Sequence, residues 1–349
     1  MKNTYRFLMM IFISSLCAQV QSKEVGELPF AISNNAVSAA KVKGNWQLFS
    51  FNGLRQQKNW QAVSNVGMGF ELSSKQNFKI EPIPFKQGRL ASIAVTVKNK
   101  IYLFGGYTVA ENHEEKSMSD VYQFDPKTQQ FSLLTHMPIP VDDTVALVYQ
   151  DRYIYLVSGW HDVGNIADVQ ILDTNTKKWF FGTPFPGNPV FGHAAGIIGN
   201  QMIVADGVKV DAIVDGRRQY KMSPQSYSGT IAPENFTKIH WRKLPAHPGK
   251  AKYRMAASGY PQKELILFTA GSDNPYNYNG IGYNGIPSQP SHDVFAWSVK
   301  NNRWQTLPPL STATMDHRGL LAVDDKLFIV GGMLENQKVS NKIIQYEID

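Results

Sequence analysis

Short runs in which hydrophobic and polar residues alternate recur along the chain, and each run ends at glycine or proline. Residues 93–97 alternate in this way, residues 101–104 are rich in β-forming side chains, and Gly105-Gly106 stops the second run. This pattern predicts an antiparallel hairpin. Residues 120–125 and 131–138 predict a third and a fourth strand, the last closing on a proline. Together these segments predict a four-stranded antiparallel unit.

The same unit returns further along the chain with its spacing preserved. Eleven positions separate the start of the third strand from the aromatic residue that opens the fourth in three repeats, at Asp120 and Phe131, Asp168 and Trp179, and Asp293 and Trp304. Pairs of small or turn-forming residues follow the second strands at Gly105-Gly106, Ser158-Gly159, Asp206-Gly207, Ala270-Gly271 and Gly331-Gly332. Repeats of about 40 to 50 residues with this arrangement are typical of β-propellers.

The glycine pairs and the recurring aromatic residues resemble the motifs of kelch-repeat proteins over almost the whole chain. The aromatic positions are Tyr122, Trp179, Trp241 and Trp304. Fourth strands end at six proline steps, which are Leu28-Pro29, Ile83-Pro84, Met137-Pro138, Thr183-Pro184, Leu244-Pro245 and Leu307-Pro308. The resemblance implies an all-β fold, a six-bladed kelch-type β-propeller. The first repeat is degenerate, because no glycine pair lies between its strand patterns at residues 39–48 and 70–72.

The two ends of the chain are expected to complete one blade together. Residues 344–347 match residues 122–125, so the last repeat stops after its third strand. Residues 25–30 resemble a fourth strand alone. We therefore expect the N-terminal strand to close the last blade and remove its open edge. Residues 23–349 are expected to form a single propeller domain, although length by itself favours two domains.

The N-terminal segment has the pattern of an export signal. A charged start is followed by an apolar run over residues 7–17. We interpret residues 1–22 as a signal peptide, cleaved after Ala18 or Ser22, and expect a periplasmic protein. Cys17 is the only cysteine, so the mature chain would hold no disulfide.

The charge balance argues against several partner classes. The chain has 35 Lys and Arg against 28 Asp and Glu, a net charge of +7 that falls to +5 without residues 1–22. Basic residues are scattered among acidic ones, so no nucleic-acid partner is expected. No second hydrophobic run approaches the length of a transmembrane helix, so no membrane insertion is expected after signal removal. The mild positive excess favours an anionic small ligand.

Polar residues gather where a propeller would place them around one mouth of its axis. In a blade whose first strand lines the axis, the residues before that strand and the loop between the second and third strands lie on one face. The residues before the first strands include Arg89, Asp142, Asp143, His193, Arg254, Asp316, His317 and Arg318. Arginine suits a carboxylate, and aspartate or histidine exchanges protons. We predict a ligand site here; the alternative is that the arginines pair with acids of neighbouring blades.

The loops between second and third strands add aromatic and amide side chains to the same face. They contribute Trp160, His161 and the segment 273–285, which contains Tyr276 and Tyr278. Aromatic rings cover the C–H faces of sugars, and amides bond their hydroxyls. The expected partner is therefore a small-molecule sugar, acidic in view of the arginines. The alternative is an insertion whose Gly and Asn residues only form turns.

No cofactor is expected. The glycines of residues 280–285 do not follow a strand and open a helix, which excludes a dinucleotide loop. The eight histidines show no close ligand pair on one strand, so no metal site is predicted.

Among exported kelch propellers, the chain looks most like the bacterial N-acetylneuraminate epimerases, which are sialic acid mutarotases. The resemblance implies interconversion of anomers by an acid and a base acting on the ring oxygen and the anomeric hydroxyl. In that family a glutamate follows the glycine of the fourth blade's second strand; here Val208 follows Gly207. The predicted catalytic residues are Asp206, Asp211, Arg217, His193, Asp316 and His317. The predicted substrate-binding residues are Arg89, Asp142, Trp160, His161, Arg254, Tyr276, Tyr278 and Arg318.

A second hypothesis stays open beside the enzyme. The same face could serve a non-catalytic propeller that binds a glycan, a peptide or an envelope protein. Acceleration of anomer equilibration distinguishes the two, since only the enzyme would show it.

Overall fold

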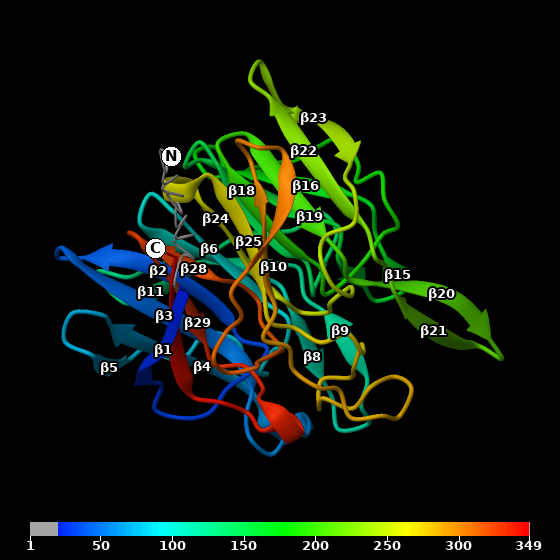
Figure 1. Ribbon diagram of the computed structural model, residues 1–349. Helices are drawn as coiled ribbons and strands as arrows, with labels where there is room; N and C mark the ends of the chain where they lie inside the picture. The colour runs from blue at the N-terminus through cyan, green and yellow to red at the C-terminus, as the bar shows by residue number, and fades with distance from the viewer. Residues whose placement is uncertain (1–19, 349) are drawn as a thin grey trace, which may run out of the picture.

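Six four-stranded antiparallel sheets surround one axis in the computed structural model, which describes residues 20–348 (Figure 1). Each sheet is one blade, and the first strands of neighbouring blades contact one another around the axis. The six-bladed β-propeller predicted from the repeats is confirmed.

The first three blades follow the chain in order. Blade 1 contains β2 (Ala36–Val42), β3 (Asn45–Leu54), β4 (Val63–Glu71) and β5 (Gln76–Lys79). Blade 2 contains β6 (Ile93–Val97), β7 (Lys100–Phe104), β10 (Asp120–Asp125) and β11 (Gln130–His136). Blade 3 contains β12 (Val145–Tyr149), β13 (Tyr153–Val157), β16 (Val169–Asp173) and β17 (Lys178–Phe181).

The other three blades complete the circle. Blade 4 contains β18 (Ala194–Ile198), β19 (Gln201–Ala205), β22 (Ser226–Ala232) and β23 (Asn235–Lys243). Blade 5 contains β24 (Ala256–Tyr260), β25 (Leu265–Thr269), β26 (Val294–Ser298) and β27 (Arg303–Leu307). Blade 6 contains β28 (Leu321–Val323), β29 (Lys326–Val330), β30 (Lys342–Ile348) and β1 (Val20–Glu27).

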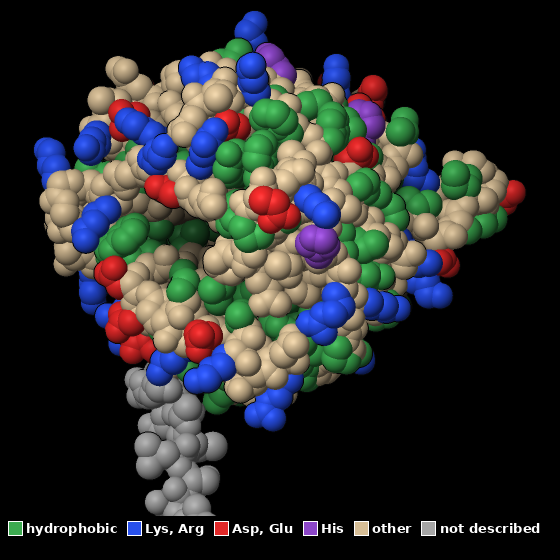
Figure 2. All heavy atoms as spheres, turned by 90° about the horizontal axis from the view of Figure 1, so that it is seen from above, with side chains coloured by type: hydrophobic (Ala, Val, Ile, Leu, Met, Phe, Trp, Pro, Cys, Tyr) green, Lys and Arg blue, Asp and Glu red, His purple; other side chains and the backbone are tan. Residues whose placement is uncertain are grey.

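Loops between second and third strands carry extra two-stranded hairpins in blades 2 to 4. These are β8 (Tyr107–Val109) with β9 (Glu115–Ser117), β14 (Trp160–His161) with β15 (Gly164–Asn165), and β20 (Val208–Val214) with β21 (Arg217–Met222). The β20–β21 hairpin projects from the body of the molecule (Figures 1 and 2). On the face shown in Figure 2, Lys and Arg side chains lie dispersed among Asp and Glu. Single 3-10 turns lie at Trp60–Ala62, Pro261–Lys263 and Glu335–Gln337.

The N-terminal strand closes the last blade, as predicted, but it lies earlier in the chain than expected. β1 pairs antiparallel with β30 over residues 20–27 instead of 25–30, with a bulge between Glu24 and Gly26. The pairing ends before Pro29 because proline has no N–H to donate. The predicted signal peptide, residues 1–22, falls mostly on residues 1–19, which lie outside the described part of the chain.

Hydrophobic side chains between adjacent blades form the core. Between blades 3 and 4, Tyr155 and Ile171 pack with Val204 and Ile231, all fully or almost fully buried. The recurring aromatic residues belong to this packing. Trp304 meets Trp297 edge to face, with ring centroids 5.3 Å apart. Such pairs add to the free energy gained from burial alone.

All six blades turn sharply after their second strand through two successive residues with positive φ. In the first blade, where we expected no such pair, Asn52 (φ 60) and Gly53 (φ 105) occupy the position. Asparagine tolerates the left-handed conformation, so it replaces the first glycine. A Cβ on Gly53 would lie 2.5 Å from the carbonyl oxygen of Ser33. The turn thus needs glycine to pack against the residues that precede the first strand.

The residues before the first strands meet the second-to-third loops, as predicted. One isolated β-bridge joins them in every blade, at Ser33–Leu54, Leu90–Tyr107, Asp142–Trp160, Phe191–Val208, Tyr253–Ser272 and Met315–Met333.

One residue of each blade forms a ring around the axis, which we call the axial ring. Its members have φ between 48° and 70° and are Asn34, Ala91, Asp143, Gly192, Arg254 and Asp316. Backbone N–H groups donate from blade to blade, as from Gly192 to the Asp143 carbonyl at 2.8 Å and from Arg254 to the Gly192 carbonyl at 2.7 Å. Between blades 2 and 1, the Ala91 N–H donates instead to the side-chain oxygen of Asn34 at 2.9 Å.

Candidate functional site

A cavity of about 200 Å³ opens on the face where the axial ring meets the second-to-third loops. We call it the upper cavity. Blades 2 to 5 contribute its walls, which are Tyr107, Glu115, Asp142, Asp143, Trp160, Phe191, Tyr220, Arg254, Asn277, Tyr278 and Tyr283. Carboxyl groups and aromatic rings therefore face one space.

Asp142 supplies a buried carboxyl group at the base of the upper cavity. Its β-bridge to Trp160 fixes the backbone, and the Ser117 hydroxyl donates to its Oδ2 at 2.6 Å. Burial, together with the negative charge of Asp143, raises the pKa of Asp142 well above its usual value. The raised pKa favours the protonated form of Asp142, which is the form that donates a proton.

Glu115 is an exposed residue of β9 at the rim of the upper cavity. Desolvation of its carboxyl group by the surrounding loops raises the pKa to about 7, with Arg254 opposing and Asp143 reinforcing the shift. A carboxyl group with this pKa exchanges protons readily at neutral pH, which suits a general base.

Four charged side chains form a buried cluster below the upper cavity, which we call the arginine–aspartate cluster; its members Asp143 and Arg254 line the cavity. The four side chains are Asp143, Arg254, Asp316 and Arg318. Arg254 donates to Asp143 Oδ2 at 2.6 Å and to Asp316 Oδ1 at 2.9 Å, and Arg318 contacts Asp143 from the other side. Burial alone would raise the pKa of Asp143, but the two guanidinium groups outweigh it and hold the pKa below its usual value. Asp143 is therefore ionised and structural.

Aromatic rings enclose the upper cavity. Trp160 packs against Phe191 and Tyr220, with centroids 5.3 and 6.0 Å apart, and Tyr220 lies 4.3 Å from Tyr283. Burial raises the pKa of both tyrosines, so their hydroxyls stay protonated and can donate. These walls offer apolar faces and hydroxyl donors together.

Comparison with known proteins identifies a sequence motif and a solved structure with a similar fold. A kelch motif matches residues 94–138, and the solved structure of YjhT aligns with a TM-score of 0.71 at 15% identity, covering 91% of this chain and 95% of that one. The chain is a six-bladed β-propeller that contains a kelch motif.

The kelch propeller also has distant sequence relatives. Human Kelch-like protein 15 is 20% identical over 263 residues, which are 72% of this chain and 40% of that protein. Human Kelch domain-containing protein 3 is 22% identical over 297 residues, 70% of this chain and 77% of that protein. The propeller thus matches less than half the length of Kelch-like protein 15.

Four of the predicted site residues line the upper cavity of the kelch propeller. They are Asp142, Trp160, Arg254 and Tyr278. Tyr276 lies just beneath, fully buried, with its hydroxyl 3.4 Å from Asp316 Oδ1. Of these residues, Asp142 is the one that brings a carboxyl group to the cavity.

The predicted histidines and one predicted arginine face the opposite side of the cluster. His193, His317 and Arg318 line a separate channel along the axis. Burial lowers the pKa of His193 to about 4 and that of His317 to about 3. Both imidazoles are therefore neutral at pH 7 and lie outside the upper cavity.

The remaining predicted residues lie away from the upper cavity of the kelch propeller. Asp206 accepts hydrogen bonds from His247 and the Lys252 backbone, both at 2.8 Å. Asp211 and Arg217 are exposed on the β20–β21 hairpin, and His161 contacts the Pro140 carbonyl. These residues do not join Asp142, because the hairpin and the blade interior carry them elsewhere.

Arg89 pairs with an acid, as the alternative to a ligand role supposed, but the acid belongs to its own blade and not to a neighbouring one. Its Nη2 lies 2.8 Å from Asp120 Oδ2, its Nη1 donates to the Gly105 carbonyl at 3.2 Å, and it stacks on Phe85. It is buried and does not line the upper cavity. Arg89 therefore locks a loop within its blade.

Sequence reasoning did not single out Glu115, Tyr107, Tyr220 or Tyr283. Glu115 lies in the loop 108–117, which was expected on this face, but its position within the loop carries no motif. A carboxylate flanking a buried Ser117 was the available signal. Its elevated pKa depends on surrounding blades and could not be inferred from the loop.

Two further findings concern residues 20–348. They include no group of three or more His, Cys, Asp and Glu side chains placed to hold a metal ion. They also include no helix long and apolar enough to cross a membrane.

Proposed function

We propose that this kelch propeller interconverts the anomers of a neutral sugar in the upper cavity. The supporting observation is that two carboxyl groups with raised pKa values, Asp142 and Glu115, line one cavity with aromatic walls. Perturbed carboxyl groups facing a common space are the usual basis for acid and base catalysis.

The two carboxyl groups divide the reaction between them. The Glu115 carboxylate takes the proton of the anomeric hydroxyl, and Asp142 gives its proton to the ring oxygen as the C–O bond of the ring breaks. An open-chain carbonyl forms. Rotation of the carbonyl followed by the reverse transfers closes the ring in the other configuration, and both carboxyl groups recover their original protonation. Trp160 and Tyr220 would cover the C–H faces of the ring, and the Asn277 amide would bond a hydroxyl.

The neutral character of the sugar follows from how the arginines are engaged. An acidic sugar was expected because Arg89 and Arg254 seemed able to hold a carboxylate together. Arg89 lies outside the cavity, and Arg254 is held by Asp143 and Asp316. Of the described residues that line the cavity, Arg254 is the only cation. The carboxylate of an acidic sugar would therefore lie near the Asp143 carboxylate without an unpaired cation to bind it.

Substitution of Glu115 tests the proposal directly. Glu115→Gln removes the base while keeping the shape, so we expect the rate of anomer equilibration to fall by about 10²- to 10⁴-fold. Exchange NMR with glucose, galactose and N-acetylneuraminate measures this rate. Glu114→Gln changes the exposed neighbouring carboxylate and should leave the rate unchanged.

The pH profile gives a second readout. Because the pKa of Glu115 is raised to about 7, the base form accumulates as the pH rises through 7, and the rate should rise with it. Acceleration that persists in Glu115→Gln with the same pH profile would refute the assignment. Sugar binding without acceleration would favour the non-catalytic, glycan-binding alternative.

A further inference from the structure

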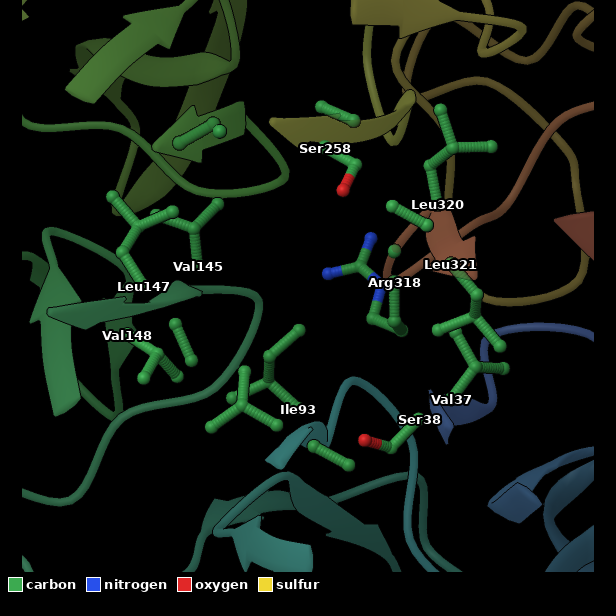
Figure 3. Close-up of a pocket in the computed structure, with 18 of the residues that line it drawn as sticks. Val37, Ser38, Ile93, Val145, Leu147, Val148, Ser258, Arg318, Leu320 and Leu321 are labelled. Atoms are coloured by element: carbon green, nitrogen blue, oxygen red, sulfur yellow. The ribbon is translucent and has the colours of Figure 1, made fainter. Parts of the chain in front are cut away.

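A second cavity lies on the other side of the arginine–aspartate cluster. We call it the axial channel. It has a volume of about 490 Å³ and is lined by first strands of all six blades. Figure 3 shows side chains from these strands around its centre, with the buried side chain of Arg318 among them. Cavities of this size commonly bind small organic molecules.

The side walls of the channel combine apolar side chains with backbone groups. Apolar side chains from all six blades line the space, among them Val37, Ile93, Val145, Leu147, Leu320 and Leu321 (Figure 3). The hydroxyls of Ser38 and Thr96 bond each other at 2.8 Å, and Thr96 also donates to the Ala39 carbonyl. Each first strand is the edge strand of its sheet, so backbone N–H and C=O groups also line the channel. A ligand therefore meets apolar side chains, backbone polar groups and few free side-chain polar groups along these walls.

Arg318 closes the channel with unused hydrogen-bond donors. Its side chain is 2% exposed, and its Nη1 contacts Asp143. Its Nε and Nη2 are buried and have no partner within the described residues. These two atoms form one edge of the planar guanidinium, the geometry that binds both oxygens of a carboxylate. A buried charge with a vacant bidentate edge is costly unless a ligand or water fills it.

Charge at the channel end favours an anion. Among the described lining residues, Arg318 is the only charged side chain, since burial keeps His193 and His317 neutral. The one carboxylate that Arg318 contacts, Asp143, also accepts from Arg254 and from the Tyr253 hydroxyl. The cluster as a whole pairs two arginines with two aspartates, so the preference for an anion rests on the unpartnered Nε and Nη2 donors of Arg318.

We propose that the axial channel binds an amphiphilic monocarboxylate, with its carboxylate on the Nε and Nη2 edge of Arg318 and its apolar chain along the first strands. This site is separate from the upper cavity and does not depend on the sugar chemistry proposed there. The upper cavity offers aromatic faces and hydroxyl donors, whereas the channel combines apolar side chains and strand-edge backbone groups with a single cation.

Calorimetric titration with octanoate, octanol and acetate tests the proposal. Octanoate should bind at least about tenfold more tightly than octanol, because a charge-assisted contact is lost in the alcohol. It should also bind more tightly than acetate, which lacks the chain. Arg318→Met should abolish the preference for octanoate over octanol. The matched control Arg242→Met changes an exposed arginine on blade 4 and should bind as the parent does.

A second variant keeps Arg318 and fills the channel instead. The Ser258 hydroxyl points into the channel (Figure 3), so Ser258→Phe should reduce octanoate affinity at least about tenfold by occupying the space. If Arg318→Met fails to fold, Ser258→Phe decides alone. Equal affinity of the parent for octanoate and octanol, or octanoate binding that Ser258→Phe leaves unchanged, would overturn the proposal.

Discussion

At the scale of single residues, the axial ring depends on a backbone conformation that side chains with a Cβ avoid. Of its six members only Gly192 is glycine, while Ala91 and Arg254 adopt φ of 52° and 54°. The left-handed conformation costs about 1–2 kcal/mol for an ordinary residue. The blade-to-blade hydrogen bonds compensate this cost, and Arg254 gains its two carboxylate partners from the same geometry.

Gly192 gives a prediction at this scale. A Cβ there would lie 1.9 Å from the ring of Tyr253, whose hydroxyl donates to Asp143. We expect Gly192→Ala to lower the free energy of unfolding by about 1–3 kcal/mol beyond the conformational cost. Gly199→Ala is the control, because Gly199 has a similar φ of 58° and nothing within 4 Å of the new Cβ. Urea denaturation of the two variants should separate them; equal losses would contradict the prediction.

At the scale of elements, closure of blade 6 protects a strand edge. β30 pairs with β29 on one side and with β1 on the other. Lys342 on β30 donates to Glu24 of β1 at 2.7 Å, and the Ser22 hydroxyl of β1 donates a hydrogen bond to the Ser311 hydroxyl. Without β1, the row of backbone groups along β30 would lack partners, which also invites pairing with other chains.

Removal of β1 tests this contribution. A chain that begins at Leu28 should lose several kcal/mol of stability, since each hydrogen bond contributes about 1 kcal/mol net, and it should aggregate more readily. The control chain begins at Val20. Thermal melting followed by circular dichroism measures the difference, and coincident melting curves would show that closure adds nothing.

The strands and loops also explain which features could be predicted from the sequence and which could not. Alternation and the glycine pairs located the strands, because both reflect local backbone geometry. Asn52-Gly53 escaped notice because its first member is not glycine. Asp211 and Arg217 were placed near the axis because only the loop was visible in sequence; β20 and β21 pair with each other and carry these side chains outward.

At the scale of the whole molecule, the arginine–aspartate cluster ties distant repeats together. Arg254 belongs to blade 5, and its partners Asp143 and Asp316 precede the first strands of blades 3 and 6. That the arginines would pair between blades was an open alternative from sequence. Which arginine meets which acid could not be predicted, since the partners lie 111 and 62 residues away.

Arg254→Met should therefore be strongly destabilising. It leaves Asp143 and Asp316 buried without this partner, which typically costs about 3–5 kcal/mol. Lys250→Met is the comparison, because Lys250 pairs with Asp273 and the two side chains are 81% and 37% exposed, where loss of a pair costs about 1 kcal/mol or less. Guanidinium denaturation measures both. A loss for Arg254→Met no larger than that for Lys250→Met would mean that the cluster does not hold the blades.

The axial ring gives the molecule a continuity that a linear row of repeats lacks. In an open array the terminal repeats have one neighbour each, so they fray first and unfolding spreads inward from them. Here the Asn34 N–H donates to the Asp316 carbonyl at 3.0 Å, which joins the first blade to the last. Every blade is consequently an interior blade, and partial unfolding has no preferred starting point at the axis. The propeller is a closed ring, and it opens only when the contacts between two neighbouring blades are broken.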